Sequence, residues 1–253
     1  MLPIFLLTND DGFFSPGLEA LQTSLQDLSE IYVIAPDREK SATSLSLSLH
    51  RPLRIQTIRS HVYAVDGTPA DCVYLAVKKL LPRPPDLVIS GINHGPNLGH
   101  QDVAYSGTVA AALQAAFLGL RSIAISLLPD NQNHYLFSEA AKMMKKIIAY
   151  FLDNPFPPGI ALNFNLPPPP VKGIKVVPLG EKRYNPQIIE NTDPRGRKYY
   201  WIGSGKPEYL LEKETDIEAV KEGFIALTPL KVNFTAIEYC QSYLWQGLYN
   251  LFT

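Results

Sequence analysis

Hydrophobic positions follow two patterns over the first 150 residues. Short apolar runs, such as 4–7 and 31–35, alternate with longer stretches in which apolar residues recur every three or four positions, such as Leu18, Leu21 and Leu25. The short runs predict buried strands, and the longer stretches predict helices that bury one face. This alternation favours an α/β fold, a parallel sheet with helices on both faces. Further strands are expected at 44–49, 87–89 and 123–127, and further helices at 68–81, 108–118 and 138–151.

Two of the predicted helices have clear starts. Ser15-Pro16 and Thr68-Pro69 each place a capping hydroxyl before a proline, which suits the first turn of a helix. The segment 44–49 alternates serine and leucine with a period of two, and this pattern predicts a half-exposed strand.

The composition changes after about residue 155, where prolines become frequent. The sequence therefore predicts two parts. Residues 1–155 form the α/β core, and residues 156–253 form a smaller β-rich extension with a C-terminal helix that completes the core. In this second part we expect strands at 160–165 and 224–228, turn-rich β segments between 171 and 223, notably 198–202, and a helix from about Ser242.

The composition of the 253 residues is that of a globular protein, with 46% hydrophobic and 19% charged residues. The 23 Lys and Arg nearly balance the 24 Asp and Glu, which argues against a protein that neutralises many phosphates of a nucleic acid polymer. A small phosphorylated ligand remains compatible with this balance. No signal peptide or membrane span is expected, so we predict a cytoplasmic protein. Cys72 lies in an apolar run and is expected to be a buried, reduced thiol.

Two adjacent acids, Asp10 and Asp11, follow the first predicted strand. In open α/β sheets, ligands bind outside the carboxyl ends of the strands. Neighbouring carboxylates at that edge need a cation to offset their repulsion, and their hard oxygens favour Mg²⁺, Mn²⁺ or Ca²⁺. The alternative is an ordinary polar loop. A dinucleotide fingerprint is missing, because bulky residues lie between Gly12 and Gly17.

Three further segments offer ligands at the same edge. Residues 90–99 carry Asn93 and Asn97, whose amides suit a metal or a phosphate, although a tight turn is the alternative. Histidines in loops, such as His94 and His100 in this segment, are more often solvated than catalytic. Ser106, Gly107 and Thr108 open a helix and can form an anion site, or Ser106 can simply cap the helix. Residues 35–41 end on Ser41, which is either a metal-facing hydroxyl or part of a solvated loop.

Taken in order, these motifs make the chain resemble the survival protein E (SurE) family of nucleotidases. The resemblance extends from residue 8 to about residue 235. It is carried by Thr8-Asn9-Asp10-Asp11-Gly12, Ala35-Pro36-Asp37-Arg38 with Ser41, Gly67-Thr68-Pro69-Ala70-Asp71, Ser90-Gly91-Ile92-Asn93 with Gly95-Pro96-Asn97, Tyr105-Ser106-Gly107-Thr108-Val109, Asp193-Pro194-Arg195-Gly196 and Thr228-Pro229-Leu230.

The resemblance implies a Rossmann-like core and a phosphatase acting on nucleoside 5′- and 3′-monophosphates. It also implies homodimers or homotetramers, in which the β-rich extension and the C-terminal helix are exchanged between subunits. One divalent ion, Mg²⁺ or Mn²⁺, is implied at Asp10, Asp11, Ser41 and Asn93, and we place the phosphate or substrate at Asn9, Asn97, Ser106, Gly107 and Thr108.

The residues support metal-assisted hydrolysis, with Asp10 and Asp11 as the catalytic pair. Two other functions use similar residues. A haloacid-dehalogenase-type phosphatase needs its two acids separated by one residue, whereas here they are adjacent. A nucleotide-binding or sensing module without catalysis would need the same metal and anion site.

Overall fold

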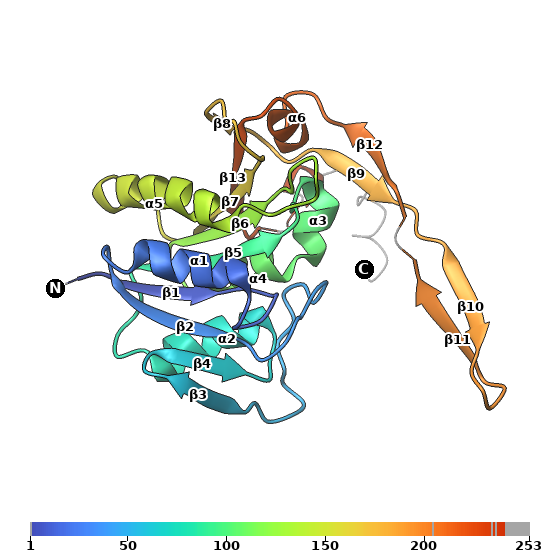
Figure 1. The fold of residues 1–253 in the computed structure, drawn as a ribbon, viewed down its shortest axis with the longest axis horizontal. Helices are drawn as coiled ribbons and strands as arrows, with labels where there is room; N and C mark the ends of the chain where they lie inside the picture. The colour runs from blue at the N-terminus through green and yellow to red at the C-terminus, as the bar shows by residue number, and fades with distance from the viewer. Residues whose placement is uncertain (1, 204, 234, 236, 241–253) are drawn as a thin grey trace, which may run out of the picture.

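The structure is a computed structural model that describes residues 2–203, 205–233, 235 and 237–240. In this part of the chain, nine strands form one sheet in the order β3-β4-β2-β1-β5-β6-β7-β13-β8 (Figure 1). The strands are β1 (Ile4–Thr8), β2 (Glu30–Pro36), β3 (Ile55–Arg59), β4 (Val62–Val65), β5 (Leu87–His94), β6 (Ser122–Leu127), β7 (Ile160–Leu166), β8 (Ile174–Val176) and β13 (Ile225–Lys231).

The sheet is mostly parallel, as the alternation of strands and helices predicts. All of its neighbouring strands pair in parallel except β3 with β4 and β13 with β7. The chain enters the sheet at β1, an inner strand, adds β2 on one side, and later adds β5 on the other. This reversal of direction beside β1 is where open α/β sheets bind ligands.

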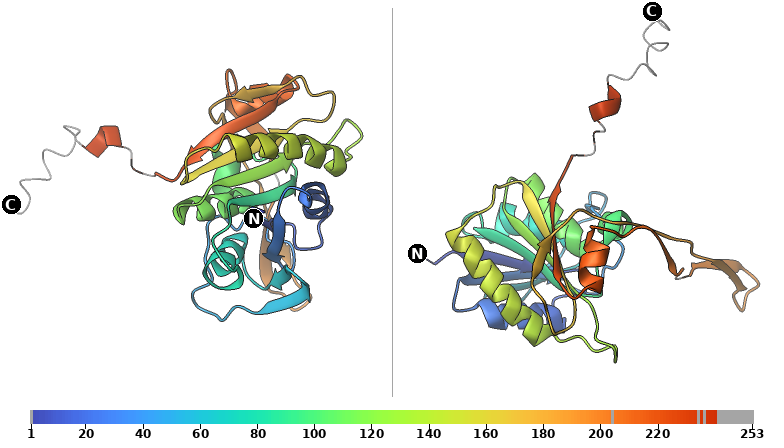
Figure 2. Two further views of the ribbon diagram at one scale, coloured as in Figure 1. Left: turned by 90° about the vertical axis from the view of Figure 1, so that its left-hand side faces the viewer. Right: turned by 90° about the horizontal axis from the view of Figure 1, so that it is seen from above.

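Helices cover both faces of the sheet (Figure 2). Because side chains alternate along a strand, Phe5 and Leu7 face one layer while Leu6 faces the other. The first layer contains α1 (Pro16–Leu25) and α5 (Phe137–Asp153), and the second contains α2 (Pro69–Leu75) and α4 (Gly107–Phe117). Each fully buried leucine contributes on the order of 2 kcal/mol through burial.

Both predicted helix starts are confirmed. The Ser15 hydroxyl caps α1 by accepting from Leu18 N, and Pro16 is the first helical residue. Thr68 and Asp71 form a capping box at the start of α2, in which each side chain bonds the other residue's backbone N–H. The predicted helix at 68–81 continues past α2 as a π-helical turn, η1 (Ala76–Leu80). Cys72 is buried, as expected.

The predicted strand at 44–49 is wrong, since this segment consists of turns and irregular chain. Its polar groups bond to loops and side chains instead of a neighbouring strand: Ser48 N donates to Asp71 Oδ1, and Ser46 O accepts from Thr68 Oγ1. The sheet edge is instead formed by β3 and β4, which the sequence did not indicate.

The segment after the predicted strand 87–89 also differs from the expected loop. β5 continues to His94, with a register irregularity against β6 between Ser90 and Asn93. A short helix that we did not predict, α3 (Gly99–Tyr105), then precedes α4. The remaining helices and strands of the first 166 residues match their predicted positions to within a few residues.

The second part of the chain supplies β7, β8 and β13 to the sheet and a long two-stranded arm (Figures 1 and 2). The arm begins with β9 (Glu181–Tyr184) paired to β12 (Pro207–Leu211) and ends with β10 (Ile188–Thr192) paired to β11 (Lys198–Ile202). The β segment predicted at 198–202 is thereby confirmed. Two short helices follow, α6 (Asp216–Lys221) and α7 (Ile237–Cys240), while the helix predicted from Ser242 lies outside the described residues.

Within the part of the chain that the structure describes, every helix is too short or too polar to cross a lipid bilayer.

Candidate active site at the carboxyl edge of the sheet

Asp10 lies two residues after β1 and is buried, with 6% of its surface exposed. Its Oδ1 accepts a hydrogen bond from the Thr108 hydroxyl, and its backbone oxygen accepts from Lys40 N at 2.7 Å. Burial raises the pKa of Asp10 to about 6, and the Thr108 hydrogen bond only partly opposes this rise. Because burial disfavours the charged form of this acid, a bound cation would stabilise its carboxylate.

The start of α4 packs directly against Asp10. A methyl group on Gly107 would lie 2.7 Å from Asp10 Cβ, so only glycine permits this approach. Ser106 caps the helix by accepting from Val109 N at 3.1 Å, and its hydroxyl hydrogen remains available to a ligand. The positive end of α4 therefore lies beside the acid pair, as an anion site requires.

Asp11 is more accessible than Asp10 and lies beside His94 at the end of β5. Its Oδ2 is 3.5 Å from His94 Nδ1, and this ring also contacts Tyr135 and Phe137. Burial raises the pKa of Asp11, and His94 partly opposes that rise. His94 is thus a neighbour of the acid pair rather than a solvated bystander.

Ser41 follows β2 and Asn93 lies near the end of β5, and these are the two strands that flank β1. The bond from Lys40 N to Asp10 O holds the loop after β2 against the acid, and Ser41 itself is exposed, with its hydroxyl donated to Glu39 Oε1 at 2.6 Å. Asn93 donates its amide N–H to Gly95 O at 2.9 Å, so its amide oxygen is the atom available to a ligand.

Asn97 is held by a buried polar network that sequence reasoning missed. Its backbone N donates to Asn165 Oδ1 at 2.8 Å, and its backbone oxygen accepts from the amides of Asn163 and Asn165, both at 3.0 Å. Its own side chain donates to Ser126 Oγ at 2.7 Å, which leaves one amide N–H for a ligand. The signal in the sequence was the pair of asparagines two positions apart in an otherwise apolar strand, since they face the same side of the sheet.

Asn9 is fully buried and organises the turn between β1 and α1. Its amide nitrogen donates to Gly12 O at 2.9 Å and to Ser15 Oγ at 2.6 Å. Its role toward substrate stays a prediction.

The residues at this edge suit a hard divalent cation. The buried Asn9 Oδ1 has no hydrogen-bond partner among the described residues, and the buried Asp11 Oδ2 has only the long contact of 3.5 Å with His94 Nδ1. Such atoms are costly unless a ligand or ion satisfies them. No group of three or more His, Cys, Asp or Glu in the described part of the chain is arranged to hold a metal, so two acids and neutral oxygens would have to form the site. That donor set favours Mg²⁺ or Mn²⁺ over zinc.

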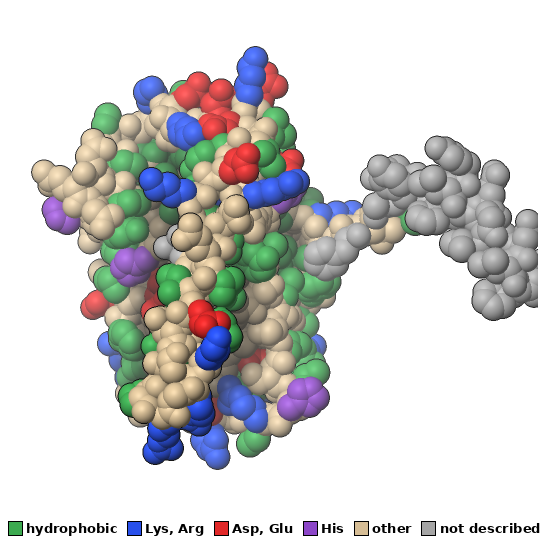
Figure 3. All heavy atoms as spheres, turned by 90° about the vertical axis from the view of Figure 1, so that its right-hand side faces the viewer, with side chains coloured by type: hydrophobic (Ala, Val, Ile, Leu, Met, Phe, Trp, Pro, Cys, Tyr) green, Lys and Arg blue, Asp and Glu red, His purple; other side chains and the backbone are tan. Residues whose placement is uncertain are grey.

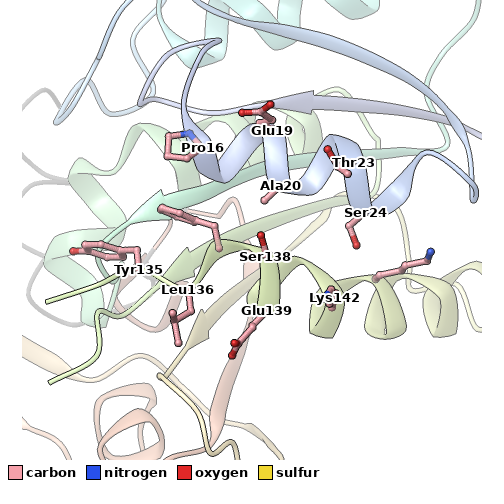
Figure 4. Close-up of a pocket in the computed structure, with 12 residues that line it drawn as sticks. Pro16, Glu19, Ala20, Thr23, Ser24, Tyr135, Leu136, Ser138, Glu139 and Lys142 are labelled. Atoms are coloured by element: carbon pink, nitrogen blue, oxygen red, sulfur yellow. The ribbon is translucent and has the colours of Figure 1, made fainter. Parts of the chain in front are cut away.

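A groove of about 840 Å³ lies elsewhere, between α1 and the start of α5 (Figure 4). It is lined by helix surface residues such as Glu19, Ser24 and Lys142, and by none of the predicted site residues. The carboxyl edge of the sheet, and not this groove, therefore concentrates the chemical groups.

Comparison with known proteins identifies the family of the chain. The family model "Survival protein SurE" matches residues 5–186. The chain belongs to the SurE family. It is 45% identical over 233 residues to the 5′-nucleotidase SurE of Pelobacter propionicus, with 91% of this chain and 94% of that protein covered. It is 44% identical over 241 residues to the 5′-nucleotidase SurE of Vibrio cholerae, with 94% of each chain covered.

A solved SurE structure shows the same fold. The crystal structure of the SurE protein from Aquifex aeolicus matches with a TM-score of 0.83 and 40% sequence identity, and the match covers 97% of this chain and 100% of that one. The Rossmann-like fold implied by the resemblance to the SurE family is thus confirmed at the level of the whole sheet and its extension.

Proposed function

We propose that this SurE-family chain is a divalent-metal-dependent nucleotidase that hydrolyses nucleoside 5′- and 3′-monophosphates to a nucleoside and inorganic phosphate. The observation that carries the proposal is the packing of the start of α4 against Asp10, because it puts an anion site and a carboxylate pair side by side. The printed name of the relatives, 5′-nucleotidase, supports the same reaction.

We assign Asp10, Asp11, Ser41 and Asn93 to one Mg²⁺ or Mn²⁺ ion. When bound, such an ion neutralises charge on phosphoryl oxygens and lowers the pKa of a coordinated water. Burial disfavours the charge on both acids and raises the pKa of Asp10 to about 6, and Asp11 Oδ2 has only the long contact with His94, so both observations support this assignment.

The remaining site residues would bind and orient the phosphoryl group. The N–H groups at the start of α4 and the Ser106 hydroxyl would donate to its oxygens, and Asn97 would donate the amide N–H that Ser126 leaves free. Donors aimed at charge that develops in the transition state are each typically worth about 3 kcal/mol. Thr108 would act through Asp10, whose carboxylate it holds, and Gly107 by allowing the close approach.

The arm supports the proposal that the chain works as a homodimer or homotetramer. All residues of β10 and β11 are exposed, among them Ile189, Tyr200 and Trp201, and Figure 3 shows hydrophobic side chains interspersed with charged ones on this side of the molecule. A two-stranded ribbon with both faces in water is only marginally stable. We therefore propose that the arm packs on another copy of the chain. The predicted division into 1–155 and 156–253 and the cytoplasmic location stay predictions.

The test is a phosphate-release assay over nucleoside 5′- and 3′-monophosphates, run with EDTA and then with Mg²⁺ or Mn²⁺ restored. We expect release only with the metal. Tight nucleotide binding without release under any metal would favour a binding module, and a phosphorylated Asp10 trapped during turnover would favour a haloacid-dehalogenase-type reaction.

A further inference from the structure

A buried ion pair joins the base of the arm to the segment between Asn97 and Ser106. Lys182 of β9 places its Nζ 2.6 Å from Asp102 Oδ2 of α3, and the side chains are only 5% and 11% exposed (Figure 1 shows β9 beside α3). Burying a lysine and an aspartate is costly unless their geometry and further hydrogen bonds compensate. Because the pair is buried, it does not serve as surface charge, and a role in holding the two segments together explains its position.

Asp102 contacts both ends of its short helix. Its Oδ2 accepts from Leu98 N at 3.1 Å, next to Asn97, and its backbone oxygen accepts from Ser106 N at 2.8 Å. A displacement of Asp102 would thus move both of the positions that we assign to the phosphoryl group.

The first residues of α3 form further hydrogen bonds with β9, with Gly180 just before it, and with Asp216 at the start of α6. His100 N donates to Gly180 O at 3.0 Å, and Tyr184 N donates to the Gln101 side chain at 2.9 Å. Buried Asp216 accepts from Gly99 N at 2.8 Å and from Gly180 N at 2.7 Å, so it joins the two segments.

The start of α3 packs closely against the residues before β9, and the buried Lys182 has two hydrogen-bond partners. A methyl group on Gly99, whose φ is +69°, would lie 2.9 Å from Gly180 O. Burial by itself would lower the pKa of Lys182, but its hydrogen bonds to Asp102 and Tyr184 outweigh that effect and raise it. The lysine is therefore charged and fixed, and it is too buried to touch a substrate.

We infer that Lys182 and Asp102 are positioning residues for phosphate binding: the base of the arm, through this ion pair, fixes α3 so that Asn97 and the start of α4 are held together. This inference rests on the proposed function. It extends that function by making the phosphate site depend on the arm, whereas Asp10 and Asp11 have no contact with β9 among the described hydrogen bonds.

The test compares Lys182→Met with Lys198→Met as a matched control. Lys198 also forms an ion pair on the arm, 2.7 Å from Glu190, but its side chain is 63% exposed. Because misplacing groups by about 1 Å can cost about 100-fold in rate, we expect Lys182→Met to lower kcat/KM by about 10- to 100-fold. The inhibition constant for inorganic phosphate should rise by a similar factor. The Mn²⁺ concentration for half-maximal activity should not change, and Lys198→Met should leave all three unchanged.

Lys182→Arg, which keeps the charge, should recover part of the loss. The inference is overturned if folded Lys182→Met retains normal kcat/KM and phosphate inhibition. It is also overturned if the Mn²⁺ requirement rises as much as the phosphate constant, because that result would indicate general loosening. Should Lys182→Met fail to fold, Asp102→Asn keeps an acceptor oxygen for Leu98 N and is judged by the same measurements.

An experiment on phosphate binding distinguishes failure of the proposed function from failure of this inference. If the wild-type protein releases no phosphate from any nucleotide, calorimetric binding of inorganic phosphate to wild type and Lys182→Met still tests the inference. Weaker binding by the variant supports it, whereas equal affinities, or no binding to wild type, overturn it.

Discussion

Asp10 and Asp11 are adjacent in the chain but differ in environment. Asp10 is enclosed by Thr108 and Gly107 of α4, whereas Asp11 is more accessible and lies beside His94. Burial raises the pKa of both acids, and for Asp10 the result is a pKa of about 6. These shifts mean that the folded chain holds two carboxylates where their charge is disfavoured, a situation that a bound cation relieves.

The accessible acid gives the first prediction. Asp11→Asn keeps the size of the side chain but removes its charge, so it should weaken Mn²⁺ binding and remove most phosphate release while leaving the melting temperature of the metal-free protein nearly unchanged. Calorimetry with Mn²⁺ and the phosphate-release assay measure the two effects. Asp27→Asn, a substitution of an acid paired with Lys145 on the surface, is the control. Near-normal turnover of Asp11→Asn would contradict the metal assignment.

The buried acid gives a prediction about pH. Between its usual pKa of 3.8 and the folded value of about 6, Asp10 binds more protons in the folded state than in the unfolded state. Its contribution to stability is therefore greatest at low pH and is lost as the pH rises through this window, by about 3 kcal/mol. The free energy of unfolding of Asp10→Asn in EDTA, measured with urea at several pH values, should lack this component.

The comparison removes the titration of Asp10 together with its repulsion of Asp11, while all other titrating residues are shared by the two proteins. Parallel stability curves for wild type and Asp10→Asn between pH 4 and 7 would contradict the pKa shift. Addition of Mn²⁺ at pH 7 should stabilise the wild type and have little effect on the variant, since a ligand that binds only the folded state raises its stability.

Single residues of the site could be predicted from the sequence where the interacting residues are neighbours in the chain. Asp10 and Asp11 were recognisable because they are adjacent and follow an apolar strand. Lys182 and Asp102 were not, since 80 residues separate them and each looks like an ordinary surface residue until the arm folds back on α3. Asn163 and Asn165 were readable as polar residues on one face of a strand, but their partner Asn97 was not.

At the scale of helices and strands, long periodic segments were predictable and short ones were not. The leucine spacing of α1 and the apolar positions of α5 identified both helices, because each buries one stripe against the sheet. α3 has seven residues, too few to show a period, and its bonds to the arm supply much of its support. The alternating segment 44–49 had the pattern of a strand, but its backbone groups bond to Asp71 and Thr68 instead of to a strand.

The polar end of β7 gives a prediction at this scale. Asn165→Ala removes the acceptor for Asn97 N and one of two donors to Asn97 O. An unpaired buried N–H costs about 1–3 kcal/mol, so the free energy of unfolding should fall by that amount. Since the segment from Asn97 to Ser106, which contains α3, would be less well fixed, kcat/KM should fall by about tenfold or more. Urea unfolding and the phosphate-release assay measure these quantities.

Asn154→Ala is the control, because Asn154 makes an exposed bond to Tyr150 O at the end of α5 and lies outside the site. If Asn165→Ala lost stability but kept its normal kcat/KM, the network would be structural only, and the orientation of Asn97 would not depend on it.

At the scale of the whole molecule, the sheet and the arm differ in how they are stabilised. Helices cover both faces of the sheet, and the alternation of apolar runs with helical periodicity in the sequence predicts this arrangement. The arm buries neither face of β10 and β11 within the chain, so its pattern of exposed Ile, Tyr and Trp indicated β structure without indicating what it contacts. Exposed apolar residues in a β segment are a feature that a single sequence can show, but they do not identify the surface that would cover them.

The arm therefore carries the last prediction. Ile189 and Trp201 are directly opposite each other on one face of the ribbon, 49% and 62% exposed. If this face packs on a second copy, Ile189→Ser with Trp201→Ser removes the apolar area that holds the copies together. Light scattering after size exclusion should then report monomers, while Tyr150→Ser, which removes a 60% exposed aromatic from α5, should leave the assembly intact. Retention of the wild-type mass by the double variant would show that other surfaces hold the oligomer, and a monomeric wild type would show that the arm has another partner.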